Sequence, residues 1–488
     1  MGEEEIIALR REKLERLRAR GIDPYPQRFR RTHTAQEAID LLGEGDQGPE
    51  VTVAGRVMAT RNMGRATFLD LRDGSGRLQV YLKRDTLGDP TYEVLHDIDL
   101  GDFLGVTGTL FRTKTGEPTV EAKSLTLLAK ALRPPPEKWH GLHDVEVRYR
   151  QRHLDLMANE EAREMVITRS KVVAALRRFL DSRGYLEVET PVLHSVPGGA
   201  AARPFVTYHN ALDRQFYLRI ALELHLKRLI IGGFDKVYEI GRTFRNEGVS
   251  TKYNPEFTML ESYEAYADYN DLMKMVEEMV CTVAGEATGL TSVPYGDTLV
   301  EFKPPWERVT LRDAIRVHSG VDFEAHPDAD SLREAVAASG VHVEAAWSRG
   351  KLIDELLTAH VEPKLLQPTF LIDYPVELSP LAKRKPDAPH LVERFELFIC
   401  GREVGNAYTE LNDPVDQRDR FLEQARLRAA GDEEAEVVDE DFLVALEHGM
   451  PPTAGLGIGI DRLVMALTGQ SSIREVILFP AMRQKESE

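Results

Sequence analysis

The feature that most constrains the fold is a series of five short segments, from residue 51 to about 130, in which apolar and polar residues alternate. They read VTVAGRV, ATFLDLRD, GRLQVYL, FLGVTGTLF and TVEAKSLTLL, and Gly, Asp-Gly and Thr-Gly turn signals separate them. A period of two places every second side chain on the same face of a strand. The segments therefore predict five strands closed into a small barrel of the OB-fold kind.

Three consecutive prolines in RPPPEKWHG, residues 133–141, follow these strands. Proline is excluded from helix interiors and central strands, so this run predicts a linker. Beyond it, strand-like runs alternate with helical periodicity, which predicts a domain of mixed helices and strands. The predicted organisation is an N-terminal helical extension at 1–50, an OB-fold β-barrel at 51–133, a linker at 134–152 and a second domain at 153–488 with an insertion around 285–360.

The N-terminal extension begins with a predicted charged helix at residues 3–20, which ends at Gly21. Two interpretations of this helix stay open: a solvated helix with one packed apolar stripe, or an arm that binds RNA. Its apolar members are Ile6, Ile7, Leu9, Leu14 and Leu17.

The net charge of −18 argues at first against a polyanionic partner. The charge is unevenly distributed, because residues 1–150 contain 24 Lys+Arg and 24 Asp+Glu and the rest of the chain carries the whole acidic excess. If RNA is bound, we expect it in this neutral N-terminal third. Its basic clusters are Arg28, Arg30 and Arg31, and Arg56, Arg61 and Arg65.

Length and composition narrow the class of protein further. A chain of 488 residues with 42% hydrophobic and 29% charged residues is long enough for two or three globular domains. No segment approaches the ~18 apolar residues of a membrane span, and the charged start MGEEEIIALRREKLERLRAR lacks a signal-peptide core. We therefore expect a cytoplasmic protein without a membrane partner. Cys281 and Cys400 form no CxxC pattern, so we expect packed thiols.

Candidate ligand-binding residues appear first in FRNEGVSTKYNPEFTMLE, residues 244–261. If this segment forms a strand, a turn and a second strand, Arg245 and Glu247 share one face. The second strand would then place on a common face Phe257, Met259, Glu261 and Tyr263.

The segment FELFICGREVGNAYTEL predicts a hairpin whose turn is formed by its Gly-Arg dipeptide. A two-residue turn puts Glu396 and Glu403 on one face, and by spacing alone a solvated carboxylate pair is a competing interpretation. Asn406 and Glu410 also share a face. Their offset from Glu403 demands a β-bulge, which we place at Gly405.

The last block, TAGLGIGIDRLVMALTG, predicts a glycine-rich strand leading into a helix. The sequence contains neither a GxxxxGK[ST] phosphate loop nor a GxGxxG dinucleotide fingerprint. Arg462 is more informative, because an arginine directly after a glycine-rich strand can reach across to a bound phosphate.

Three segments, in their order and spacing, resemble the motifs of class II aminoacyl-tRNA synthetases. YLEVETPVL, which we predict to be one strand, resembles motif 1 with its Pro191. VYEIGRTFRNEGVSTKYNPEFTMLESY resembles motif 2, and GLGIGIDRLVMAL resembles motif 3. Together with the preceding barrel, nearly the whole chain is similar to the bacterial-type lysyl-tRNA synthetases. The resemblance implies an α+β fold, with an antiparallel catalytic sheet flanked by helices. It also implies an OB-fold that reads the anticodon and a homodimer formed through motif 1.

The resemblance also implies a reaction. Such an enzyme activates L-lysine with ATP to lysyl-adenylate and pyrophosphate, then transfers lysine to the 3′ end of tRNA(Lys). The lysine carboxylate attacks as an anion, so positioning and electrostatic stabilisation carry the catalysis. The implied cofactor is Mg²⁺, which prefers hard oxygen ligands.

The ATP site follows from the same resemblance. Arg245 and Arg462 are the implied catalytic residues: the first would hold the lysine carboxylate and the α-phosphate, the second the adenine and the γ-phosphate. Phe257 would stack under the adenine, although its pattern alone also fits core packing. The implied ATP-binding residues are Arg245, Glu247, Lys252, Asn254, Phe257, Glu396, Glu403 and Arg462, of which Glu396 and Glu403 would hold the metal.

An acidic pocket would select the lysine side chain. Glu410 and Tyr263 would receive the ε-ammonium, because a buried cation needs a carboxylate and further acceptors. Glu223 and Glu261 would take the α-amino group, and Asn406 the carboxylate. The implied lysine-binding residues are Gly199, Glu223, Arg245, Glu261, Tyr263, Asn406 and Glu410.

In the barrel, Phe68 and Gln79 match positions that stack on and read the central anticodon base, a mode suited to unstacked single strands. A barrel-core role for Phe68 stays open. The implied anticodon-binding residues are Arg56, Phe68, Gln79 and Glu117.

One departure from the family pattern lies in the motif 2 loop, where Lys252-Tyr253 replaces the usual Arg-His. Two other functions also stay open. An aspartyl or asparaginyl enzyme is disfavoured by the acidic Glu410. A synthetase-like module that binds RNA without aminoacylating would be expected to lack Arg245, Arg462 or the Glu396/Glu403 pair, and all are present.

Overall fold

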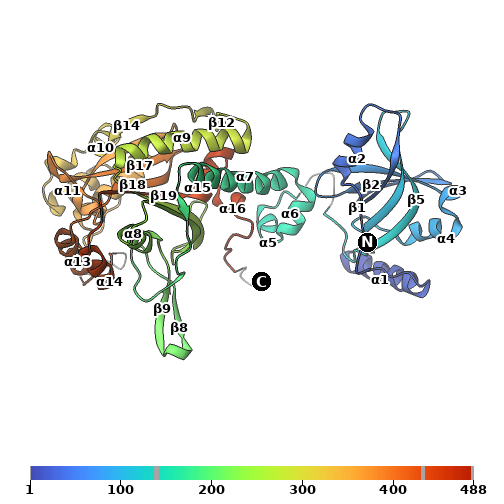
Figure 1. The fold of residues 1–488 in the computed structure, drawn as a ribbon, viewed down its shortest axis with the longest axis horizontal. Helices are drawn as coiled ribbons and strands as arrows, with labels where there is room; N and C mark the ends of the chain where they lie inside the picture. Colours follow the sequence, from blue (N-terminus) through green and yellow to red (C-terminus); the bar gives the residue numbers. More distant parts are fainter. Residues whose placement is uncertain (1, 137–141, 430–434, 485–488) are drawn as a thin grey trace. The chain divides into compact units, whose positions relative to one another are not determined.

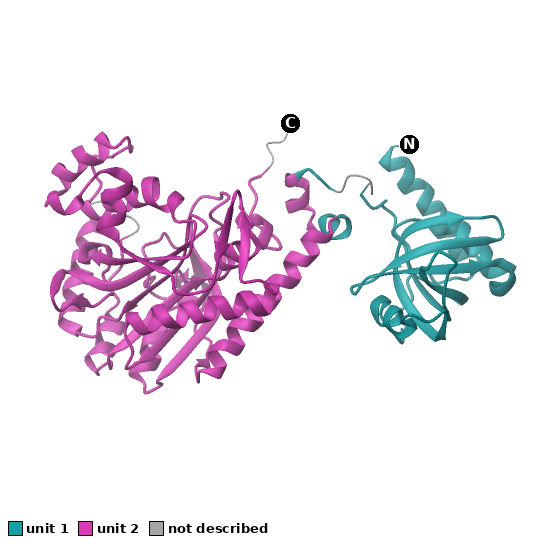
Figure 2. Cartoon of the chain, turned by 90° about the horizontal axis from the view of Figure 1, so that it is seen from above, with its two compact units in different colours: residues 1–144, 153–158 teal, residues 145–152, 159–488 magenta. Residues whose placement is uncertain are grey.

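The computed structural model describes residues 2–136, 142–429 and 435–484 (Figure 1). The chain forms two compact units, one of residues 1–144 with 153–158 and one of residues 145–152 with 159–488 (Figure 2). Part of the predicted linker, residues 137–141, lies outside the described residues.

The first unit contains the predicted barrel. Its five strands close in the order β1-β2-β3-β5-β4, and every pair is antiparallel except β3 with β5. Alternate side chains fill the interior, among them Val53, Leu69, Val80 and Leu104. The strands are β1 (Gln47–Asn62), β2 (Ala66–Arg72), β3 (Arg77–Lys83), β4 (Phe103–Arg112) and β5 (Pro118–Ala129). The OB-fold prediction is confirmed.

Helix α1 (Glu3–Ala19) packs along this unit. Leu14 and Leu17 are buried, and the Arg10 guanidinium donates to the backbone carbonyls of Leu100, Ala131 and Arg133. The helix is thus anchored by a packed stripe and a buried arginine. The other helices of the region are α2 (Ala35–Leu42), α3 (Arg84–Leu87), α4 (Asp89–Tyr92) and a 3-10 turn (Glu93–Asp97).

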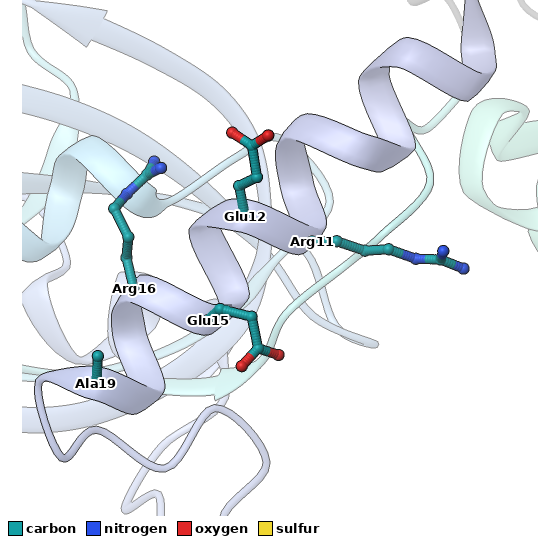
Figure 3. Close-up of a pocket in the computed structure, with 5 residues that line it drawn as sticks. All are labelled: Arg11, Glu12, Glu15, Arg16 and Ala19. Atoms are coloured by element: carbon teal, nitrogen blue, oxygen red, sulfur yellow. The ribbon is translucent and has the colours of Figure 1, made fainter.

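An open hollow on α1 is lined by Arg11, Glu12, Glu15, Arg16 and Ala19 (Figure 3). Its charged side chains diverge from one another and carry both signs. The hollow therefore indicates no ligand of a particular charge.

The second unit is built on one large sheet with the strand order β14-β15-β17-β18-β19-β11-β10-β6. Its central pairs are antiparallel, whereas the two outer pairs, β14 with β15 and β10 with β6, are parallel. The strands are β6 (Leu186–Glu187), β10 (Lys236–Phe244), β11 (Glu256–Ala265), β14 (Glu307–Thr310), β15 (Thr369–Pro375), β17 (Ala388–Ile399), β18 (Arg402–Thr409) and β19 (Thr453–Gly459), with β16 (Arg384–Lys385) paired to β17.

Helices cover this sheet and confirm the predicted α+β class. One face packs against α7 (Glu160–Ser182), α9 (Tyr269–Thr288) and α15 (Ile460–Thr468), which share a core with Phe395 and Leu397 (Figure 1). Glu396 and Phe398 point to the opposite face. The remaining α-helices and strands are α5 (Val145–Arg150), α6 (Arg152–Ala158), α8 (Glu223–Ile231), α10 (Leu311–Ser319), α11 (Ala329–Ala338), α12 (Arg349–Leu356), α13 (Pro414–Ala429), α14 (Glu440–Glu447), α16 (Ile473–Val476), β7 (Leu193–His194), β8 (Val206–His209), β9 (Arg214–Leu218), β12 (Ser292–Tyr295) and β13 (Thr298–Glu301).

Two local predictions were wrong. YLEVETPVL is not one strand but β6 and β7, which belong to different sheets. Strand β10 ends at Phe244, so Arg245 and Glu247 lie in a loop. The Arg245 N–H still donates to the Pro255 carbonyl at 2.9 Å, but proline has no N–H to return, and the ladder ends there.

Both cysteines are free thiols, and Cys400 is buried, as predicted for a packed thiol. Among the residues that the structure describes, no helix combines the length and apolarity needed to cross a bilayer.

Candidate active site

One face of the large sheet gathers side chains that are far apart in the sequence. Glu261 and Tyr263 project from β11, Glu396 from β17 and Asn406 from β18, and β19 joins β18 to β11. Register brings Glu396 opposite Asn406, and residues directly opposite share a face. The sheet therefore unites the predicted metal, carboxylate and side-chain positions.

The predicted hairpin is present with two shifts of one residue. Cys400 (φ 55°) and Gly401 (φ 71°) form its turn, and two positive φ angles are the requirement of a type I′ turn. The β-bulge lies at Val404 instead of Gly405, because Phe398 pairs with Glu403 and Leu397 with Gly405. The buried Val404 takes its place in the core of the opposite face. Glu403 thereby stays on the face of Glu396, as predicted.

The carboxylate pair is held by groups that the sequence did not reveal. Arg394 lies 2.5 Å from Glu396 Oε1 and also donates to Asn406 Oδ1 at 3.0 Å. The Tyr374 hydroxyl donates to Glu396 Oε2 at 2.8 Å. Burial raises the pKa of Glu396 to about 7, which Arg394 opposes and the nearby Glu403 reinforces. Two crowded carboxylates of this kind suit a divalent cation.

Arg462 lies at the start of α15 and forms an ion pair with Glu403 at 3.0 Å. Its guanidinium lies 5.8 Å from the ring centroid of Tyr253. Lys252 lies 3.9 Å from Glu362, an acidic group that the sequence analysis did not single out. The residues that replace the usual Arg-His thus face Arg462 and Glu362.

Arg245 lies 5.2 Å from the ring centroid of Phe257, which is half-buried and belongs to none of the core clusters. Core packing therefore does not account for this ring. Glu247 is exposed in the loop. The Asn254 side chain is used structurally at both ends, since it donates to the Glu256 carbonyl and accepts from the Ala481 N–H.

A cluster of buried acidic side chains lies at the other end of this face, where the lysine pocket was predicted. The Tyr263 hydroxyl donates to Glu261 Oε2 at 3.1 Å, and the Leu222 N–H donates to Glu261 Oε1 at 2.9 Å. Burial raises the pKa of Glu261 to about 7, and Glu223 adds to the effect. The pKa of Glu410 is raised well above its ordinary value by burial, which the Lys227 ammonium only partly offsets.

Lys227 is the main pocket residue that the sequence analysis missed. Its fully buried ammonium lies 2.5 Å from Glu223 and forms an ion pair with Glu410. The Tyr408 hydroxyl donates to the other oxygen of Glu223 at 2.6 Å. The spacing of Glu223 and Lys227 in ELHLK, four residues apart on one helix, was the available signal.

Glycines make room for this pocket. A Cβ at Gly455 would collide with Glu410 and Tyr263, and β19 therefore needs glycine there. Gly199 has φ +86°, and a Cβ on it would meet Glu223 at 3.3 Å. The predicted Gly199 thus borders the predicted Glu223.

In the barrel, Phe68 stacks on Tyr81 at a centroid distance of 4.5 Å and lies on the outer face, away from the buried cluster. This placement contradicts a barrel-core role. Gln79, on the same face, accepts from the Thr119 hydroxyl at 3.0 Å, and Glu117 is exposed.

Arg56 is not brought to these residues. It pairs with Arg72 at one end of the β1–β2 ladder, whereas Phe68 pairs with Arg61 near the other end. Its guanidinium lies 4.3 Å from the ring centroid of Phe103 and donates to the Gly101 carbonyl at 3.0 Å.

Sheet, barrel and polar face together define a class II synthetase, and comparison with known proteins agrees. The family described as tRNA synthetases class II (D, K and N) matches residues 144–483, and the OB-fold nucleic acid binding domain matches residues 51–128. The chain belongs to the family of class II tRNA synthetases (D, K and N).

Similar curated proteins cover the whole chain. A protein of Moorella thermoacetica is 56% identical over 99% of this chain and 99% of its own length. A protein of Dehalococcoides mccartyi is 55% identical over 100% of this chain and 99% of its own length, and one of Bacillus subtilis is 54% identical over 98% and 97%. Each of the three is named "Lysine--tRNA ligase".

Proposed function

We propose that this chain is a lysine–tRNA ligase. It activates L-lysine with ATP to lysyl-adenylate, releases pyrophosphate and transfers lysine to the 3′ end of tRNA(Lys). The observation that carries the choice of amino acid is the buried carboxyl of Glu410 beside the Tyr263 ring, at the end of a pocket that holds further carboxyl groups. An acidic pocket suits an ammonium-bearing side chain and rejects aspartate.

Activation begins when the lysine carboxylate attacks the α-phosphorus and pyrophosphate leaves. Arg245 is proposed to bind both the carboxylate and the α-phosphate, which brings nucleophile and electrophile together. Arg462 is proposed to bind the γ-phosphate and to lie over the adenine that Phe257 supports from the other side. Glu247, Lys252 and Asn254 complete the proposed ATP site.

The remaining lysine contacts are proposed for the pocket end of the sheet. Glu223 and Glu261, beside Gly199, would receive the α-amino group, and Asn406 would orient the carboxylate. In the second step, the terminal hydroxyl of the tRNA attacks the acyl carbon and AMP departs.

Mg²⁺ is the proposed cofactor, and the donor set fits it, because Glu396 and Glu403 are two carboxylates on one face of the sheet. When bound there, the ion would neutralise charge on the triphosphate. Among the described residues, no cluster of three or more His, Cys, Asp or Glu suits another metal.

The tRNA anticodon is proposed to bind the barrel, with Phe68 stacking on a base and Gln79 reading its edge. Arg56 and Glu117 are proposed as further anticodon contacts. The Thr119 hydroxyl that contacts Gln79 also lies 3.0 Å from the Glu117 carbonyl, whereas Arg56 lies at the other end of the β1–β2 ladder from Phe68.

A homodimer is proposed through the region of motif 1. Exposed apolar side chains concentrate between residues 186 and 234, as expected of a surface that a second copy covers. They are Leu186, Val192, Leu193, Val206, Tyr208, Leu212 and Phe234. The cytoplasm is the proposed location.

ATP–pyrophosphate exchange with each of the twenty amino acids tests the function. Lysine should support exchange far above the others. Exchange driven by aspartate or asparagine would favour the sister enzymes instead, and exchange with no amino acid would favour a binding module.

A further inference from the structure

Four buried carboxyl groups and one buried ammonium interact electrostatically in the acidic pocket. Lys227 of α8 contacts Glu223 and Glu410, and Glu261 lies on β11, the strand against which α8 packs. The fourth group is Glu436, which lies in the segment before α14 and is 5% exposed. Glu436 Oε2 has no hydrogen-bond partner in the described part of the chain.

The proposed function creates a conflict at Lys227. Glu223 and Glu410 are the carboxylates proposed for the two ammonium groups of the substrate, and in this structure Lys227 binds both. A buried ammonium that loses its carboxylates without replacement is strongly destabilised, because it is left both desolvated and unpaired. Lys227 therefore needs another counter-ion when lysine occupies the pocket.

We propose that Glu436 is a positioning residue that takes over the Lys227 ammonium when lysine binds, which frees Glu223 and Glu410 for the substrate. The inference rests on the proposed function. Among the groups that act electrostatically on Glu436 are Glu223 and Lys227 from α8, and Glu436 in turn acts on Tyr408 of β18. Its free oxygen is the acceptor that this exchange requires.

The protonation of Glu436 agrees with this role. Burial and the neighbouring Glu223 raise the pKa of Glu436 to about 8, against the opposing effect of Lys227. Near pH 7 the carboxyl is thus mainly protonated in the absence of lysine. Closer pairing with Lys227 stabilises the carboxylate, so lysine binding should release this proton to solvent.

Calorimetric titration of the full chain with L-lysine alone tests the exchange. At pH 7, in two buffers of different ionisation enthalpy, the parent protein should release a proton that Glu436→Gln does not. The lysine Kd should rise about tenfold in Glu436→Gln, and the ratio of the two Kd values should grow from pH 6.5 to pH 8.5. Glu436→Asp should restore part of the affinity.

The matched control is Glu440→Gln. Glu440 lies at the start of α14, and its exposed carboxylate pairs with Arg418 of α13. This variant should bind lysine like the parent. In exchange assays, Glu436→Gln should raise the KM for lysine and leave kcat and the KM for ATP nearly unchanged.

Three results would overturn the inference. Equal proton release and equal Kd in Glu436→Gln would show that Glu436 does not act on Lys227. A parallel loss of lysine and ATP affinity would show a merely structural role. A parent that binds no lysine would remove the proposed function as well, whereas an active parent with an unaffected variant removes this inference alone.

Discussion

Arg462 donates to Glu403 Oε2 at 3.0 Å and to the Glu403 backbone carbonyl at 2.8 Å. These contacts join the proposed phosphate-binding arginine to the proposed metal-binding carboxylate. Binding of Mg²⁺–ATP would replace this ion pair with an arginine–phosphate and a carboxylate–metal contact. The pair holds both side chains at the site beforehand.

Removing either carboxylate of the proposed metal pair should raise the Mg²⁺ requirement. Glu396→Gln and Glu403→Gln each delete an anionic oxygen beside the triphosphate, so adenylate formation should slow and need more Mg²⁺. Lysine-dependent exchange measured across a Mg²⁺ titration checks this. Glu307→Gln, on the exposed edge strand, is the control, and parental titration curves for both variants would refute the metal assignment.

Glu410→Gln should impair lysine activation selectively. The change keeps the shape but removes the charge that faces the ε-ammonium. The activation free energy that corresponds to kcat/KM for lysine should therefore rise by about 3–5 kcal/mol. The KM for ATP should hold, and lysine analogues with an uncharged end should lose their disadvantage. Because Glu410 also contacts Lys227, thermal unfolding of the variant must accompany the exchange assay.

The control for this pocket is Glu447→Gln, an exposed carboxylate on α14. Lysine activation by Glu410→Gln at the parental rate would mean that the pocket has been assigned wrongly. A parent that prefers aspartate would have the same meaning.

Phe68→Ala should weaken tRNA use without affecting amino-acid activation. Loss of a base-stacking ring costs about 1–3 kcal/mol, which should appear in kcat/KM for tRNA(Lys). Lysine-dependent exchange should stay near the parental rate. Leu41→Ala, at an exposed position of α2, serves as the control. An equal loss in both assays would mean that Phe68 supports the fold only.

His194 should make the protein less stable in mild acid. Burial lowers the pKa of His194 to about 4, with His225 and Arg219 contributing in the same direction. The unfolded chain, with a pKa near 6.5, therefore binds more protons between these two values. Stability from this group is fully present above pH 6.5 and falls toward pH 4, by up to about 1.4 kcal/mol per pH unit.

Chemical unfolding of the parent and of His194→Gln, at several pH values and one protein concentration, measures this effect. The plot of stability against pH should be flatter on its acid side in the variant, because glutamine does not titrate. The glutamine amide can still donate to the Pro191 carbonyl, which lies 2.9 Å from His194 Nε2. His448→Gln, at an exposed position, should keep the parental slope. An unchanged slope in His194→Gln would contradict the prediction.

The sequence by itself determined the features that depend on local pattern. Alternation predicted the five barrel strands, and period two placed Phe257, Glu261 and Tyr263 on one face of β11. The need for a bulge before Asn406 also followed from counting alone. These features depend on which side of a strand each residue points to, and that is written into the order of residues.

Tertiary structure decided which groups face each other across the pocket. Spacing along α8 could pair Lys227 with Glu223 but not with Glu410, which lies far along the chain, and Arg394 has no pattern of its own. Proline and core packing also overrode local expectation: Pro255 ended the ladder at Arg245, and the buried Val404 took the bulge assigned to Gly405. Ion pairing and packing depend on distances between elements, and only the folded sheet sets those distances.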